Sequence, residues 1–400
     1  MSSGLSKARL GRMHQTMAAY VEAREVPGVV TLVSRRGEVH VDAIGAKALD
    51  GRDPIGRDTI FRIASMTKPI TAVATMILVE ECKLRLDEPV ERLLPELANR
   101  RVLKRMDGPL DETVPARRPL TVRDLLTFRM GFGMSLGPPN ASPIAKAVAD
   151  AQIQSLKPAP PLAPDEWIKR LGSLPLMQQP GEHWMYHTGA DVLGVLIARA
   201  SGQAFDAYLE ERIFRPLGMK DTGFSVPRAK LSRLATCYAI NPQTRALDLH
   251  DSASDSAWAQ PPAFPAGGGG LVSTVEDYYT FGSMMLNGGR HGNERILSRH
   301  SVEAMTTDQL TADQKATAAF FPGFFDSRGW GFGVSVVIKR DGVSTSPGQF
   351  GWSGAFGTQW FSDPREQLVA LLMIQRLDIG ATAAGIRPDF STSVYQAIDD

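Results

Sequence analysis

The spacing of hydrophobic positions changes twice along the chain, from strand-like to helical and back again. After a helical pattern over residues 8–24, residues 28–43 alternate as two strands that turn at Arg36-Gly37. A second strand-like region comprises residues 331–338, 351–361 and 367–374, with a turn at 363–366. Helical periodicity dominates between these ends, over residues 122–130, 165–174, 190–200 and 205–213.

This order of elements predicts an α+β fold. Strands from both chain ends would form one antiparallel sheet flanked by helices, including a closing helix over residues 392–398, with a mostly helical lobe inserted between the two ends. The sheet lobe would span residues 1–80 and 265–400, and the helical lobe residues 81–264. A cleft between the two lobes is the expected place for a functional site.

Residues 135–165 interrupt the helical pattern with seven prolines around a short helix-compatible stretch, residues 144–154. The segment is either a lid over the cleft or an exposed connection without a role in substrate choice. The pattern leaves both interpretations open.

Composition and charge exclude several classes of protein. Lys and Arg total 44 against 43 Asp and Glu, so no basic surplus is present to bind a nucleic acid. The N-terminus lacks the apolar core of a secretory signal, and the longest clean apolar run, residues 368–374, is too short to span a membrane. We expect a cytoplasmic protein without nucleic-acid or membrane partners, and its two cysteines, Cys82 and Cys237, as buried free thiols.

The first candidate for chemistry is Ser65-Met-Thr-Lys68, directly before a strongly helical run at residues 72–79. Positions i and i+3 share a helix face, so the Lys68 amine can reach the Ser65 hydroxyl. A serine is a weak nucleophile until a base takes its proton, and burial near a helix N-terminus lowers the pKa of a lysine enough for that role. Taken alone, the tetrapeptide fits a helix cap followed by a surface lysine better than a catalytic pair.

Two further segments add candidates. Tyr186 stands in a turn-prone entry to a helix, where an ammonium beside the phenol would favour its anion and allow it to move protons. Trp352-Ser353-Gly354-Ala355 lies in a glycine-punctuated strand that permits close approach to a ligand. If this strand lies beside the Ser65 helix, the Ala355 and Ser65 N–H groups form an oxyanion hole. The simpler interpretations are a core tyrosine and an ordinary strand with a bulge.

In order and spacing, these three segments resemble the class C β-lactamase-like superfamily of serine hydrolases, and especially its serine esterase branch, the family VIII carboxylesterases. Supporting stretches lie at residues 120–127, 216–224 and 267–277. The resemblance implies a fold like that of β-lactamases and penicillin-binding proteins, and an acyl-enzyme that water hydrolyses. It also implies Ser65 as nucleophile, with Lys68 and Tyr186 as the acid/base pair.

The sequence departs from the family pattern at two places. The Tyr-x-Asn of the family reads Tyr186-His187-Thr188, which makes His187 and Thr188 candidates for lining the cleft, although surface packing explains His187 equally well. The Lys-Thr-Gly of β-lactamases reads Trp352-Ser353-Gly354, which removes a cation suited to a substrate carboxylate. Neutral, fairly apolar esters therefore fit better than β-lactams or peptides.

Three other patterns compete with this interpretation. Gly133-Met-Ser135-Leu-Gly137 matches a nucleophile elbow, but a helix-like stretch precedes it and prolines follow. His183 and His187 have zinc-ligand spacing without the glutamate of the His-Glu-x-x-His motif. The glycines at 267–270 lack the Gly-Lys-Ser/Thr of a phosphate loop, and Ser273 with Glu276 resembles a helix capping box.

The sequence thus predicts a carboxylesterase for short acyl or aryl esters that needs no metal or organic cofactor and forms acyl-Ser65. An acyltransferase or weak β-lactamase of the same fold is the alternative within enzymes. A catalytically silent binding or scaffold protein is the alternative from another class. The oligomeric state stays open.

Overall fold

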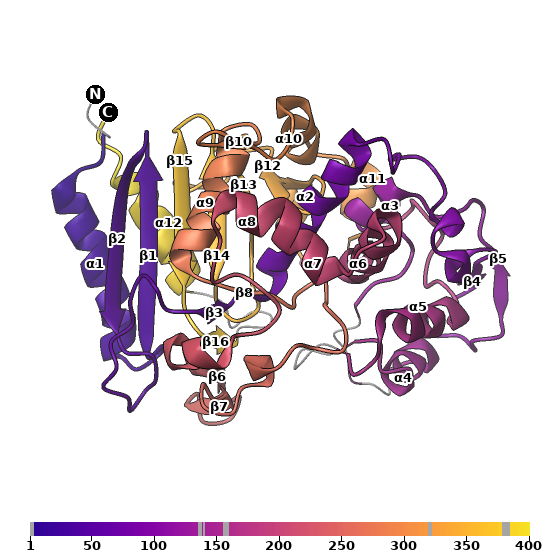
Figure 1. Ribbon diagram of the computed structural model, residues 1–400, viewed down its shortest axis with the longest axis horizontal. Coiled ribbons are helices and arrows are strands. Elements are labelled where there is room, and N and C mark those ends of the chain that lie inside the picture. Colours follow the sequence, from indigo (N-terminus) through magenta and orange to yellow (C-terminus); the bar gives the residue numbers. More distant parts are fainter. Residues whose placement is uncertain (1–3, 135–137, 139–140, 155–159, 319–321, 378–384) are drawn as a thin grey trace.

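A seven-stranded antiparallel sheet runs through the computed structural model, which describes residues 4–134, 138, 141–154, 160–318, 322–377 and 385–400 (Figure 1). The strand order is β11-β12-β13-β14-β15-β1-β2. Val30 of β1 lies opposite Met373 of β15, so the two chain ends meet inside one sheet, as the sequence predicted. The strands are β1 (Gly28–Arg35), β2 (Glu38–Gly45), β11 (Arg328–Trp330), β12 (Ser335–Val337), β13 (Phe350–Ser353), β14 (Gln359–Asp363) and β15 (Leu368–Met373).

Helices cover both faces of this sheet because its strands bury both sides. Val29 and Val33 of β1 pack with α1 (Lys7–Glu22) and α12 (Ile386–Gln396) in one cluster. The alternate residues Val30 and Leu32 face α2 (Thr67–Glu80) and α9 (Val275–Leu286) in the main core. The two termini lie together beside α1 in Figure 1.

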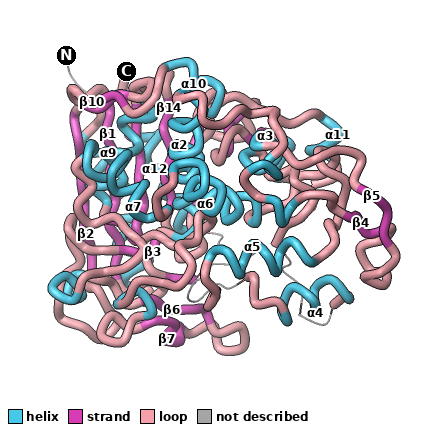
Figure 2. The backbone as a smooth tube through the Cα atoms, turned by 45° about the vertical axis from the view of Figure 1, so that its right-hand side comes forward, coloured by secondary structure: helices cyan, strands magenta, loops and turns pink. Residues whose placement is uncertain are grey.

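The helical part continues the main core away from the sheet. It contains α3 (Val122–Leu126), α4 (Pro143–Asp150), α5 (Pro164–Ser173), α6 (Thr188–Ser201), α7 (Phe205–Leu209), a π-helical turn (Glu210–Phe214) and α8 (Arg215–Leu217). Figure 2 shows α4 and α5 side by side, on the opposite side of the molecule from β2. Side chains from α2, α3, α5 and α6 belong to one hydrophobic cluster, so the core is continuous from sheet to helices.

Smaller elements complete the described chain. The short strand pairs are β3 (Phe61–Arg62) with β8 (Val272–Ser273), β4 (Arg101–Leu103) with β5 (Thr113–Pro115), and β9 (Arg290–His291) with β10 (Glu294–Arg295). A three-stranded sheet contains β6 (Cys237–Ile240), β7 (Leu247–Asp251) and β16 (Arg376–Leu377). The short helices are α10 (Arg299–Met305) and α11 (Ala312–Ala316).

Several expected elements differ from those observed. The single strand expected over residues 351–361 is instead the antiparallel hairpin β13–β14, because Gly357 has a φ of +91° and its N–H closes a turn on the Gly354 carbonyl. The single strand expected over residues 331–338 is instead the hairpin β11–β12, because Gly333 has a φ of +73° and the Gly331 N–H closes a turn on the Val334 carbonyl. The closing helix begins at Ile386 rather than near residue 392, since a proline at position 388 is acceptable in a first turn. The helix expected over residues 122–130 ends at Leu126.

Two local predictions were wrong: which residues cap α9, and the burial of Cys82. The α9 cap is Thr274, whose side chain accepts from the Asp277 N–H, so the expected Ser273–Glu276 box is displaced by one residue. Cys237 is buried but Cys82 is exposed, because the chain leaves the core just after α2 ends.

Residues 135–165, the segment that is either a lid or an exposed connection, lie partly outside the described residues. In its described part, Ile144 and Val148 of α4 are buried in the main core. The Trp167 indole N–H of α5 donates to the Ile153 carbonyl at 2.9 Å. The division into lobes at residues 81 and 264 stays a prediction. It now has to accommodate β6 and β7, which join β16 from the C-terminal part.

Candidate active site

Ser65 lies on a one-turn 3₁₀ helix, Ala64–Met66, that leads directly into α2. Ala64 has a φ of +42°, an unfavourable conformation for a residue with a Cβ. The Tyr278 hydroxyl anchors the turn by donating to the Met66 carbonyl at 2.8 Å. Ser65 itself is only half-buried, so the turn presents its hydroxyl to an incoming molecule.

Lys68 lies one turn further along and is almost completely buried. Its Nζ is 2.9 Å from Ser65 Oγ and 3.1 Å from His187 Nδ1, and it also donates to the Gly268 carbonyl. Burial lowers the pKa of Lys68 to about 7, while the negative charge of Asp191 acts in the opposite direction. Near neutral pH, a large fraction of Lys68 is therefore the free amine that a proton acceptor must be.

Tyr186 completes the contacts around the Ser65 hydroxyl, to which its phenol is hydrogen-bonded. The phenol oxygen accepts from Trp352 Nε1 at 2.7 Å, and Lys68 Nζ lies 4.5 Å from the centroid of the ring. Burial raises the pKa of Tyr186 above its usual value, although the Ser65 and Trp352 hydrogen bonds and the Arg387 charge lower it. The raised pKa favours the protonated phenol and opposes the expected anionic form.

His187, expected only as a cleft-lining candidate, contacts Lys68 and Asp191 directly through its two ring nitrogens. Its Nδ1 faces Lys68, and its Nε2 is 3.1 Å from Asp191 Oδ2 one helical turn further along. Burial lowers the pKa of His187, and the neighbouring Lys68 lowers it further. The backbone of His187 has a φ of +86°, which turns the chain into α6. Thr188, the other cleft candidate, is buried, and its Oγ1 makes no hydrogen bond within the described residues.

Two residues of this cluster escaped sequence reasoning. Asp191 Oδ1 accepts the Gly268 N–H at 2.7 Å, and the Gly268 carbonyl accepts from Lys68. A Cβ at Gly268 would lie 2.9 Å from both Asp191 Oδ1 and the His187 ring, so only glycine fits there. The glycine run at 267–270 was a visible signal of such a close approach, but nothing in the sequence showed what approached it.

The β13–β14 turn is packed against the chain just before Ser65. A Cβ at Gly354 would lie 2.3 Å from the Ile63 carbonyl oxygen, so glycine is required for this contact. Arg387 of α12 holds the turn from the other side by donating to the Gly354 carbonyl at 2.6 Å. Ala355 packs against the same small cluster as Ala64. These contacts support an oxyanion hole formed by the Ala355 and Ser65 N–H groups, which stays a prediction.

Aromatic rings surround Tyr186 and form one wall of the site. The cluster contains Phe128, Trp184, Trp330 and Trp352, and Phe324 and Phe325 pack against it. Trp330 and Trp352 meet edge to face, with ring centroids 4.7 Å apart. Trp352 therefore belongs to an apolar wall.

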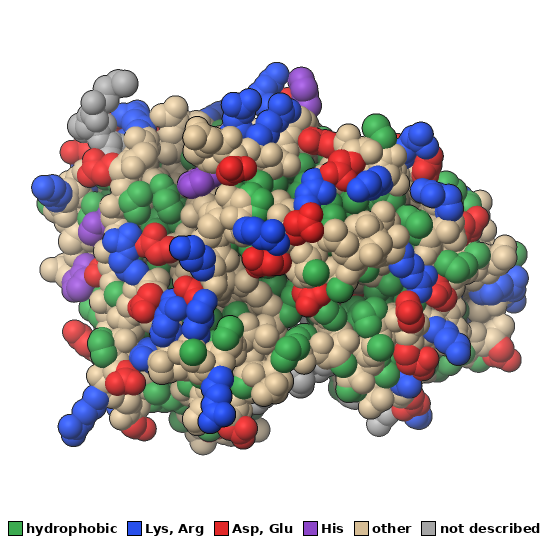
Figure 3. Space-filling model, in the orientation of Figure 1, with side chains coloured by type: hydrophobic (Ala, Val, Ile, Leu, Met, Phe, Trp, Pro, Cys, Tyr) green, Lys and Arg blue, Asp and Glu red, His purple; other side chains and the backbone are tan. Residues whose placement is uncertain are grey.

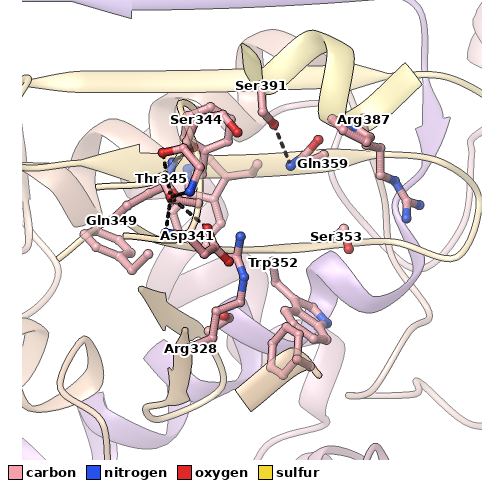
Figure 4. A pocket seen from close by; sticks show the side chains of 18 residues that line it. Arg328, Asp341, Ser344, Thr345, Gln349, Trp352, Ser353, Gln359, Arg387 and Ser391 are labelled. Atoms are coloured by element: carbon pink, nitrogen blue, oxygen red, sulfur yellow. Dashed lines mark hydrogen bonds between the residues drawn. The ribbon is translucent and has the colours of Figure 1, made fainter. Parts of the chain in front are cut away.

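A cavity of about 520 Å³ lies beside β13, with Trp352 and Ser353 in its lining (Figure 4). In its lining, the Gln359 amide of β14 donates to the Ser391 hydroxyl of α12 at 3.3 Å. Figure 4 shows Arg328 and Arg387 approaching it from opposite sides. The cavity is therefore more polar than the aromatic wall.

The competing sequence patterns gain no support. Ser135 lies outside the described residues. The chain from His183 to His187 precedes α6 and is not helical, and the described residues contain no group of three metal-ligating side chains.

No helix in the described ranges has both the length and the apolar character to cross a bilayer. Charges of both signs are interspersed over the face in Figure 3.

Comparison with known proteins identifies the class. The beta-lactamase family matches residues 13–387, so the chain belongs to this family of serine hydrolases. It is 37% identical over 401 residues to Protein Rv1367c of Mycobacterium tuberculosis, covering 94% of this chain and 96% of the relative. It is 30% identical over 369 residues to Esterase EstB of Burkholderia gladioli, covering 88% and 86%. The solved structure of EstCE1 has the same fold, with a TM-score of 0.79 at 22% identity, covering 98% and 99% of the two chains.

Proposed function

We propose that the protein is a serine carboxylesterase that hydrolyses short-chain acyl or aryl esters through an acyl-Ser65 intermediate. The observation that carries the proposal is the convergence of two proton carriers on one alcohol. Lys68 Nζ lies 2.9 Å from Ser65 Oγ, and the Tyr186 phenol is hydrogen-bonded to the same hydroxyl. A nucleophile in contact with both a base and a proton donor is the arrangement that acyl transfer requires.

Acylation begins when the neutral Lys68 amine takes the Ser65 proton while Oγ attacks the ester carbonyl carbon. The carbonyl oxygen becomes an oxyanion that accepts the N–H groups of Ser65 and Ala355. When the tetrahedral intermediate collapses, the bond to the leaving alcohol breaks. Tyr186 donates its proton to that alcohol and recovers one from the Lys68 ammonium, so the base is neutral again.

Deacylation repeats the same steps with water. The Lys68 amine accepts a proton from a water molecule that attacks the acyl carbon. When the second tetrahedral intermediate collapses, the bond between the acyl carbon and Ser65 Oγ breaks, Oγ takes the proton back from the Lys68 ammonium, and the carboxylic acid leaves. No step requires a metal or an organic cofactor.

The surroundings of Ser65 favour neutral esters. Trp352 supplies an apolar face instead of a cation, and the aromatic wall offers contact to an aryl or short alkyl group. The cavity beside β13 shares Trp352 with this wall, but Ser65, Lys68 and Tyr186 do not line it. The name of the relative EstB, an esterase, agrees with this substrate class.

The second candidate is acyl transfer to an alcohol other than water. EstCE1 is described as a hydrolase with promiscuous acyltransferase activity. An apolar wall that binds an alcohol better than it admits water would favour the same outcome here. Product analysis with added acceptor alcohols separates the two reactions, and nitrocefin tests residual β-lactamase activity.

Covalent labelling tests the proposal directly. A fluorophosphonate should modify Ser65 of the wild type, as read by peptide mass spectrometry, and p-nitrophenyl butyrate should be hydrolysed. Ser65→Ala should lose both, whereas Ser135→Ala, which removes the competing nucleophile, should keep both. Absence of labelling with no ester hydrolysis would favour the silent binding or scaffold protein.

A further inference from the structure

His187 is held by contacts on both of its ring nitrogens. Nε2 lies 3.1 Å from Asp191 Oδ2, and Nδ1 lies 3.1 Å from Lys68 Nζ. The His187 side chain is only 13% exposed and that of Asp191 only 6%, so both contacts are shielded from solvent. In the Tyr-x-Asn pattern of the family, the named polar residue is the asparagine at the position of Thr188, and the position of His187 is unspecified.

The Asp191 carboxylate determines which ring nitrogen carries the proton. A carboxylate only accepts hydrogen bonds, so Nε2 must be the N–H of the neutral ring. Burial lowers the pKa of His187, which keeps the ring neutral. Nδ1 therefore directs a lone pair towards Lys68.

This lone pair constrains the Lys68 amine. A neutral amine has two N–H bonds and one lone pair. The Gly268 carbonyl and His187 Nδ1 are both acceptors, so they take the two N–H bonds. The lone pair is then left for the third neighbour, the Ser65 hydroxyl.

We propose that Asp191 and His187 are positioning residues that orient the free amine of Lys68 with its lone pair towards Ser65. The inference rests on the proposed function and deepens it. His187 keeps its Nε2 proton throughout, and the only proton that moves in the first step goes from Ser65 Oγ to Lys68 Nζ. The resulting ammonium keeps the same acceptors and lies over the Tyr186 ring.

Asp191→Asn is a sharp test because the new amide has only one allowed orientation. Its oxygen must accept the Gly268 N–H, so its NH₂ group faces His187 Nε2. The ring must then move its proton to Nδ1 and donate to Lys68. The amine lone pair turns towards His187 and away from Ser65.

The expected kinetic result is a fall in kcat of about 100-fold or more for p-nitrophenyl butyrate, by analogy with other wrong-tautomer variants, with little change in KM. The acidic limb of the kcat/KM profile should move by about one unit to lower pH, because Asp191 raises the pKa of Lys68 and an N–H facing an ammonium is repulsive. A merely loosened site would admit water and move the limb to higher pH instead.

Variants of His187 test whether catalysis needs the hydrogen-bond acceptor at Nδ1 or the imidazole ring as a whole. His187→Asn places an amide oxygen near the Nδ1 position and tolerates a positive φ, so it should retain more than about a tenth of the wild-type kcat. His187→Gly relieves the backbone but removes the acceptor, so it should lose at least about tenfold more than His187→Asn. Equal losses in the two variants would overturn the role of the acceptor.

A matched control is Asp277→Asn, another buried carboxylate that accepts one backbone N–H and one side-chain donor, from Asp221 and Thr222. It should lower thermal stability and leave kcat and the pH limb unchanged. ¹⁵N NMR of labelled histidine should assign the Nε2–H tautomer to wild-type His187 and the Nδ1–H tautomer in Asp191→Asn.

The outcomes distinguish this inference from the proposed function. Wild-type enzyme that labels at Ser65 while Asp191→Asn has normal kinetics would overturn the positioning role alone. A wild-type Nδ1–H tautomer would do the same. A wild-type chain that neither labels nor hydrolyses esters would overturn both proposals.

Discussion

At the scale of single residues, Lys68 shows how a cation is turned into a base. Its ammonium is removed from water, and Asp191 is linked to it through His187 and Gly268 rather than by a direct contact. A carboxylate in direct contact would hold the proton on the lysine and raise its pKa. The imidazole between them thus holds the Lys68 amine in one orientation without a direct ion pair to Asp191.

The pKa of Lys68, about 7, sets the predicted pH dependence. Below this pH the lysine is the ammonium, which accepts no proton, and above it the lysine is the free amine. We therefore expect kcat/KM for a neutral ester to rise through about pH 7 and then level off. Initial rates between pH 5 and 9 measure this, and a flat profile across that range contradicts Lys68 as the base.

Tyr186→Phe should abolish most of the activity without unfolding the protein. The change removes the proton donor to the leaving alcohol and leaves the Trp352 N–H without its acceptor. We expect kcat to fall about 100- to 10,000-fold, the usual contribution of general acid/base catalysis. Steady-state kinetics measure the fall, and Trp352→Phe, which keeps the phenol, should fall much less. Tyr186→Phe with more than a tenth of the wild-type kcat would rule out this role.

Sequence reasoning reached the residues that belong to recognisable motifs. Ser65 and Lys68 are three apart, on a 3₁₀ turn and the start of the helix that follows it, so their contact is local. The contacts of Asp191 and Gly268 join distant parts of the chain, and no periodicity encodes them. The raised pKa of Tyr186 also lay beyond the sequence, because it comes from burial that only the folded chain reveals.

At the scale of elements, the turn between β13 and β14 links the sheet to the nucleophile. Gly354 touches Ile63, and Arg387 of α12 holds the turn from behind. The position of the Ala355 N–H therefore depends on the β13–β14 turn, on the chain at Ile63 and on α12. A substitution that adds one methyl group here can act on catalysis without touching a substrate.

Gly354→Ala is the corresponding prediction. Its Cβ would collide with the Ile63 carbonyl, and the turn must move away from the Ser65 helix. Removal of one oxyanion donor reduces kcat by about 100- to 1000-fold, and we expect a loss of this order. Gly11→Ala, whose Cβ meets nothing within 4 Å, is the control and should leave kcat unchanged. Equal kcat values for the two variants would remove Ala355 from the oxyanion hole.

The hydrophobic period predicted most helices and strands, but not the turns that interrupt them or where they begin and end. The first helix and the β1–β2 hairpin lie within two residues of the expected bounds, because period and turn residues agree there. The β11–β12 hairpin was missed because the residues on both sides of its glycine turn are equally strand-like. The start of α12 was missed because its first turn contains a proline.

At the scale of the whole molecule, the sheet separates stability from catalysis. The face that carries α1 and α12 has its own apolar cluster, while Ser65 and Lys68 belong to elements on the other face. The chain ends build the first cluster, and Arg35 bridges Glu366 and Asp400 beside it. Losses from α1 in this cluster, unlike losses from α12, whose Arg387 holds the β13–β14 turn, should therefore lower the free energy of unfolding without changing the geometry around Ser65.

Met17→Ala tests this separation. Met17 of α1 is fully buried between α1 and the sheet, and its truncation should lower the free energy of unfolding by about 2–5 kcal/mol. Met17→Leu, which nearly conserves volume, should lose less than about 1.5 kcal/mol. Urea unfolding measures both changes, and kcat at 25 °C should stay within about twofold of wild type, because each folded molecule retains the Ser65 geometry. A loss of kcat in native buffer that parallels the loss of stability would show that the two faces of the sheet are coupled.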